Sequence, residues 1–141
     1  MKALGLAALL GIALAGHALP AAAQAARAKV DLRCDPVAIG PTLDCVVQLA
    51  SRDGTPLDGA QVTLSASMPS MPMAHRIAPT VASATGRPGQ YRGALALEMS
   101  GVWALQVDIA GPLRDRAIVR LQADECPDGQ KRCAVRAAGK P

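Results

Sequence analysis

The chain has 141 residues, and its 15 lysines and arginines against 11 aspartates and glutamates give a formal net charge of +4. This length suits one domain with appendages rather than several domains. There is no phenylalanine, and Tyr91 and Trp103 are the only tyrosine and tryptophan. Because base stacking needs aromatic faces and the positive charges are scattered, the composition argues against a nucleic-acid-binding protein.

The first 23 residues predict a secretory signal peptide. Lys2 precedes an apolar run over residues 3–15. The small residues Ala21-Ala22-Ala23 then form a typical cleavage site. We expect cleavage after Ala23, with Ala25 as the alternative. The run is shorter than the roughly 20 residues that span a bilayer, which disfavours an uncleaved anchor. The mature chain is therefore expected to be periplasmic or secreted, without membrane insertion.

From residue 29 onward, short stretches with alternating apolar residues are separated by turn signals, which predicts an all-β fold. In one of them, Val62, Leu64 and Ala66 share a face. No segment after the leader sustains the spacing of an amphipathic helix. The predicted strands are Lys29–Cys34, Leu43–Ala50, Ala60–Ser67, Arg76–Ala82, Gln90–Glu98, Val102–Ile109 and Arg116–Gln122. About seven strands are typical of an immunoglobulin-like β-sandwich.

We assign residues 24–122 to this domain and residues 123–141 to a C-terminal tail that ends in solvent. The predicted core is small and consists of valine, leucine, isoleucine and alanine, with Trp103 as its anchor rather than as a ligand contact. A small core of this kind gives modest burial.

The four cysteines, Cys34, Cys45, Cys126 and Cys133, predict disulfides, since an even number in a small exported domain usually forms bridges. Three pairings are possible. We favour the local bridges Cys34–Cys45 and Cys126–Cys133, because Cys34 ends one predicted strand and Cys45 opens the next. A site with four thiolates on a metal is the alternative, but the spacings do not resemble those of zinc sites.

The segment MPSMPMAH, residues 68–75, concentrates soft donor atoms. Met68, Met71 and Met73 lie within six residues, and the run closes on His75, the only histidine outside the leader. A thioether suits Cu(I) and is a poor ligand for magnesium, calcium or zinc, while imidazole suits copper in either oxidation state. The residues therefore predict a Cu(I) site, to which Met99 could add a sulfur from a neighbouring turn.

Geometry restricts this prediction. Met71, Met73 and His75 would point to one side of a strand. At a rise of about 3.3 Å per residue, however, the first and last would lie some 13 Å apart. Pro69 and Pro72 break strand pairing, so we expect a bent connection that brings donors together.

Other interpretations of these residues remain open. Met68 could continue the buried face of the preceding strand. The methionines could instead plug one end of the sandwich, with His75 exposed, or form an adaptable apolar surface for a protein partner.

Several segments together resemble the YtkA-like domain, a relative of the domain in FixH proteins. The segments are MPSMPMAH, Gly89-Gln90-Tyr91, Met99-Ser100-Gly101-Val102-Trp103 and the upstream residues 54–62, and their order and spacing fit over residues 29–122. The resemblance implies an exported immunoglobulin-like sandwich of a kind that often accompanies copper handling or haem–copper oxidase assembly.

The resemblance also maps the sulfur motif of the family onto Met68, Met71, Met73 and His75, and its turn methionine onto Met99. Two features depart from it. From its short apolar run, this chain is not expected to have the N-terminal transmembrane helix of FixH proteins, and it carries four cysteines that the pattern does not include.

The expected function is that of a soluble periplasmic protein that binds Cu(I) for delivery or resistance. Its partners would be the copper ion and a periplasmic or membrane copper-handling protein. The alternative is a non-catalytic interaction module of an efflux or oxidase-assembly system. An enzyme is not expected, because Asp44, Glu98 and Asp108 look solvated and no paired carboxylates or further histidine accompany His75.

Overall fold

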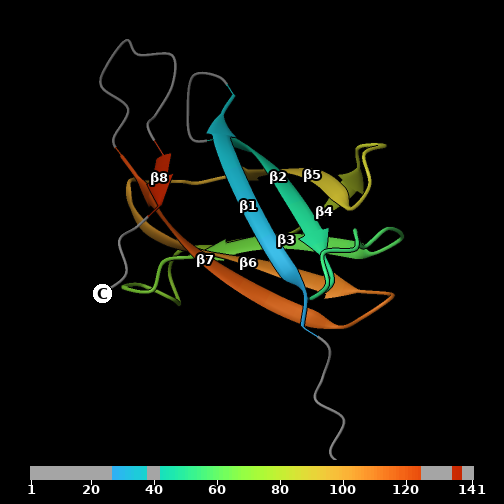
Figure 1. Ribbon diagram of the computed structural model, residues 1–141. Helices are drawn as coiled ribbons and strands as arrows, with labels where there is room; N and C mark the ends of the chain where they lie inside the picture. The colour runs from blue at the N-terminus through green and yellow to red at the C-terminus, as the bar shows by residue number, and fades with distance from the viewer. Residues whose placement is uncertain (1–26, 38–41, 125–134, 138–141) are drawn as a thin grey trace, which may run out of the picture.

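The computed structural model describes residues 27–37, 42–124 and 135–137 (Figure 1). Eight strands make up the described fold. They are β1 (Lys29–Pro36), β2 (Thr42–Ala50), β3 (Gln61–Ser67), β4 (Arg76–Ala84), β5 (Gln90–Ala96), β6 (Gly101–Ala110), β7 (Asp115–Ala123) and β8 (Val135–Ala137). The seven predicted strands are confirmed, with ends that differ by a few residues. Within the described ranges, no helix is long and apolar enough to cross a membrane.

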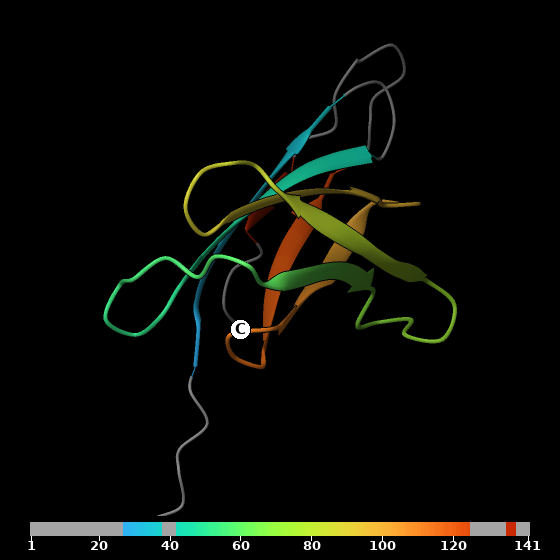
Figure 2. The ribbon, with the colours of Figure 1, turned by 90° about the vertical axis from the view of Figure 1, so that its right-hand side faces the viewer.

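The strands form one antiparallel sheet in the order β1-β2-β5-β4-β3-β6-β7-β8, and β1 contacts β8 where the sheet nearly closes on itself (Figures 1 and 2). The prediction of an all-β fold is confirmed, whereas the prediction of a sandwich is corrected to a barrel-like sheet. The cause is β4. Its residues 76–82 pair with β3, and Ser83 and Ala84 then pair with β5, so that β4 joins the two halves into one sheet.

Part of the C-terminal tail belongs to this sheet, whereas the end of the tail lies outside the described residues. Val135–Ala137 pairs with Leu121–Ala123 of β7 and adds the short strand β8. At the other end of β7, Asp115 accepts a hydrogen bond of 2.8 Å from the backbone N–H of Ala28, just before β1. Both ends of β7 are therefore tied to the neighbouring part of the sheet.

The core lies inside the barrel and is lined by alternate residues of the strands, as their period of two requires. Trp103 is fully buried, which confirms it as a core residue. Tyr91 is also buried, and its hydroxyl donates to the Leu57 carbonyl at 2.8 Å and accepts from the Ala60 N–H at 2.9 Å. The phenol thus fixes the connection between β2 and β3 at the end of the barrel.

The predicted Cys34–Cys45 disulfide is confirmed. The two cysteines face each other across β1 and β2, with a Cα–Cα distance of 4.1 Å, and Cys45 is fully buried. Cys126 and Cys133, the second predicted bridge, lie outside the described residues.

A surface ion pair between Asp44 on β2 and Arg92 on β5 gives the fold a pH dependence. The hydrogen bond from Arg92, followed by its positive charge, lowers the pKa of Asp44 below its ordinary 3.8 despite partial burial. A carboxyl whose folded pKa is depressed stabilises the fold above its unfolded pKa, and that contribution disappears as the pH falls through the folded pKa. We expect Asp44→Asn to unfold at lower urea concentration than the wild type at neutral pH, and the difference to vanish well below pH 3.8. Urea titrations at both pH values test this, and an equal difference at both would contradict it.

Candidate functional site

The methionine-rich segment forms a compact loop between β3 and β4. The Met68 N–H donates to the His75 carbonyl at 3.1 Å, which closes the loop, and the Met71 N–H donates to the Met68 carbonyl at 3.0 Å. The N–H groups of Ala74 and His75 both donate to the Met71 carbonyl at 3.2 Å. The predicted bend is confirmed, and it turns the chain back within the span that contains both prolines.

Met68 points into the barrel. Its side chain is 4% exposed and continues the buried row of Val62, Leu64 and Ala66, as the alternative interpretation of the sequence proposed. Its methyl group lies over Gly101 at the start of β6, where an added Cβ would be 2.6 Å from Met68 Cε. The φ of Gly101 is 131°, a conformation that side chains rarely adopt. The backbone conformation therefore favours glycine at this position, and an added Cβ would displace the flexible end of Met68.

His75 lies on the same side of the hairpin as Met68. The pairing of Ser67 with Arg76 places Met68 opposite His75, and directly opposed residues share a face. The His75 side chain is 28% exposed, so it is half-buried rather than free in solvent. Its Nδ1 is buried and has no hydrogen-bond partner, since Glu98 Oε2 lies 3.7 Å away.

Met99 lies in the turn between β5 and β6, in sequence between a residue close to His75 and a residue close to Met68. The residue before it, Glu98, is next to His75, and Gly101 supports Met68. The Met99 carbonyl accepts a hydrogen bond of 3.0 Å from Trp103 Nε1, and its side chain is 39% exposed. The core tryptophan therefore holds this turn in place.

The structure thus brings Met68, His75 and the Met99 turn to one end of the barrel. Met71 and Met73 lie on the hairpin loop, with side chains that are 40% and 95% exposed. Met73 packs against almost nothing, so it does not join the other donors in this conformation. Of the candidate donors, Met68 and His75 therefore lie toward the barrel, whereas Met71 and Met73 lie on the loop.

Two neighbours of the site were not identified from the sequence. Glu98 is solvated as expected, with a side chain that is 68% exposed, but it follows the end of β5 instead of lying in the strand, and its Oε2 is 3.7 Å from His75 Nδ1. Gly101 was interpreted only as part of a turn. The sequence signal that could have identified them is the short spacing of Met99, Gly101 and Trp103. Residues this close in sequence lie at the same end of the barrel.

Among the described residues, no group of three or more histidine, cysteine, aspartate or glutamate side chains is placed to hold a metal ion. A metal site at this end of the barrel would therefore depend on the thioethers of the methionines together with His75.

The fold and this end of the barrel define a small all-β domain with a histidine and methionines at its rim. The YtkA-like family model matches residues 22–108, more than half of the chain. The chain belongs to the YtkA-like family. The match includes all five methionine and histidine candidates and ends within β6, before β7 begins. Comparison with curated proteins and with solved structures finds no match.

Proposed function

We propose that this protein binds Cu(I) at the end of the barrel formed by Met68, His75 and Met99, and that it serves copper delivery or resistance. The observation that carries the proposal is the buried His75 Nδ1 without a hydrogen-bond partner, on the same face as Met68 and beside the Met99 turn. Buried polar atoms are almost always paired, and an exception asks for an explanation such as a missing ion.

The chemistry of this donor set favours a soft monovalent ion. Two thioethers and one imidazole carry no negative charge, and thioethers select Cu(I) over hard divalent cations. Met71 is partly exposed on the same loop, and its flexible unbranched side chain can turn to complete the coordination. Glu98 beside the site supplies a negative charge that partly balances the ion.

The proposal includes export of the protein, which would act in the periplasm or outside the cell. The predicted leader over residues 1–23 supports this, and so does the Cys34–Cys45 disulfide, because structural disulfides persist in oxidising compartments. In such a compartment disulfides remove the competing thiolates, which leaves methionine and histidine as the soft ligands. The proposal includes no catalytic role.

Binding of Ag(I), a stable substitute for Cu(I), provides the test. We expect the methyl signals of Met68 and Met99 in ¹³C-methyl NMR spectra to shift strongly on addition of Ag(I), together with the His75 imidazole signals. Replacing a residue that only supports a metal ligand commonly costs 10–100-fold in affinity. Met99→Leu or His75→Ala should therefore weaken Ag(I) binding by at least about tenfold.

Met73→Leu is the matched control, since it removes the same atom from a side chain that is 95% exposed. It should leave the affinity nearly unchanged. Equal losses in Met73→Leu and Met99→Leu, or the absence of any methyl shift, would contradict the proposed site.

A specific observation also supports the second candidate, a non-catalytic interaction module. Met71 and Met73 are exposed at the tip of a loop, and exposed methionines suit adaptable protein-binding surfaces. In this case a purified copper-handling protein should bind equally well in the presence of a chelator. The double variant Met71→Ser, Met73→Ser should abolish that binding, whereas Met99→Leu should not.

A further inference from the structure

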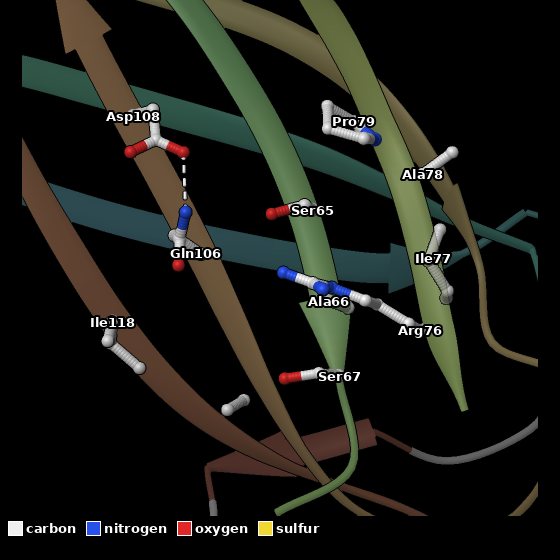
Figure 3. A pocket seen from close by; sticks show the side chains of 11 residues that line it. Ser65, Ala66, Ser67, Arg76, Ile77, Ala78, Pro79, Gln106, Asp108 and Ile118 are labelled. Carbon is white, nitrogen blue, oxygen red and sulfur yellow. Dashed lines mark hydrogen bonds between the residues drawn. The ribbon is translucent and has the colours of Figure 1, made fainter. Parts of the chain in front are cut away.

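A groove of about 330 Å³ runs over the outer face of the sheet, across β3, β4 and β6 to β7 (Figure 3). Ser65 and Ser67 lie in it, and they alternate along β3 with the buried Leu64 and Ala66. The groove is therefore on the opposite side of the sheet from Met68 and the barrel interior, and it shares no ligand with the proposed copper site.

The groove is hollow because its floor consists of small side chains. Ser67 pairs with Ala104 on β6, and Ser65 pairs with Gln106, so two serines and an alanine lie side by side. Larger residues border them. On one side, β4 has an irregular register between the pairs Leu64–Thr80 and Ala66–Ile77, at the position of Ala78 and Pro79. On the other side, Ile118 of β7 pairs with Gln106.

The polar groups without partners in this groove are hydrogen-bond donors. Arg76 is opposite Ser67, and Figure 3 shows its guanidinium reaching over β3 between the hydroxyls of Ser65 and Ser67. Within the described part of the chain, neither the guanidinium nor either hydroxyl has a hydrogen-bond partner, and Arg76 has no ion pair.

The acidic residue of the groove is already neutralised. Asp108 accepts hydrogen bonds of 2.6 Å from Gln106 Nε2 and from Arg116 Nε. Burial raises its pKa, but these two bonds and the charge of Arg116 outweigh burial, so the pKa is lower than usual. One end of the groove therefore offers a positive charge and two hydroxyls, while the other end holds a compensated carboxylate.

We propose that this groove binds the carboxylate of a small organic acid with an aliphatic body. A guanidinium can hold a carboxylate through two parallel hydrogen bonds, and serine hydroxyls can donate further ones. The aliphatic body would lie along Ala104 and Ile118, on the β6 and β7 side of the groove. The volume lies at the lower end of the range of about 300–1,000 Å³ for small-molecule sites, which suits a ligand of a few carbon atoms.

Titration of the metal-free protein with pentanoate, at constant ionic strength set with chloride, tests this proposal. Saturable shifts are expected in ¹H–¹⁵N spectra for the amides of Ser65, Ser67, Arg76 and Ala104. Acetate should bind more weakly than pentanoate, because it lacks the aliphatic body. The absence of saturable shifts, or inorganic phosphate binding as tightly as pentanoate, would overturn the proposal.

Two arginine variants separate a built site from general electrostatic attraction. Arg76→Gln should weaken pentanoate binding by at least about tenfold, since a charge-assisted hydrogen bond contributes more than a neutral one. Arg52→Gln is the matched control, because Arg52 is exposed in the turn after β2 and does not line the groove. Equal losses in the two variants would show attraction to net charge alone and overturn the proposal. Ile118→Ala should weaken pentanoate binding more than acetate binding.

Discussion

Replacing Trp103 with alanine is expected to lower the free energy of unfolding by about 3–5 kcal/mol, the usual cost of removing a large aromatic side chain from a core. Trp103 is fully buried in a core that has no phenylalanine. Small domains are commonly stable by only about 5–15 kcal/mol, so this variant should be close to unfolding at ambient temperature. Urea unfolding followed by circular dichroism measures the change.

Val102→Ala is the control for this experiment, because Val102 is the neighbouring residue on the outer face and is 39% exposed. Its expected effect is well below that of Trp103→Ala, and equal effects would contradict the assignment of Trp103 as the core anchor.

The variant Trp103→Phe tests the connection between the core and the proposed site. It keeps an aromatic ring but removes the hydrogen bond from Nε1 to the Met99 carbonyl, so the Met99 methyl signal should shift even where the fold persists.

Loss of the Cys34–Cys45 disulfide is expected to lower the free energy of unfolding by about 2–3 kcal/mol. A bridge restricts the unfolded chain, and the chain-entropy relation gives about 3 kcal/mol for a loop of about 15 residues. The sequence separation here is 11. The buried Cys45 thiol would also lose its partner in the core.

The measurement isolates this bridge when Cys126 and Cys133 are both replaced by alanine. In that background, adding a reductant should shift the urea midpoint to lower concentration, and the double variant Cys34→Ala, Cys45→Ala should no longer respond to reductant. An unchanged midpoint on reduction would contradict the prediction.

Much of the secondary structure could be predicted from the sequence because apolar residues with a period of two mark half-buried strands. Val62, Leu64 and Ala66 are one example, and all three are buried. The closure of the sheet could not be predicted in the same way. It depends on β4 changing partners near Ser83, and a strand of three residues such as β8 has no periodicity to detect.

One feature of the candidate site, its bend, was predictable because it depends on local sequence alone. Pro69 and Pro72 predicted the bend, since proline cannot continue a ladder. The sequence does not show which methionine points into the barrel. That depends on where β3 ends and on the space left by Gly101, which are features of the tertiary structure. The groove beside Arg76 was not predicted at all, because it requires the register of strands that are far apart in the sequence.

The short strand β8 has a consequence for how molecules of this protein meet one another. It covers Leu121–Ala123 of β7, at the edge where the sheet comes close to β1. An uncovered strand edge is a template on which another chain can add a strand, and such pairing leads to aggregation. Proteolytic loss of residues 135–137 would uncover that edge, so we expect the shortened chain to pair with neighbouring copies more readily at high concentration.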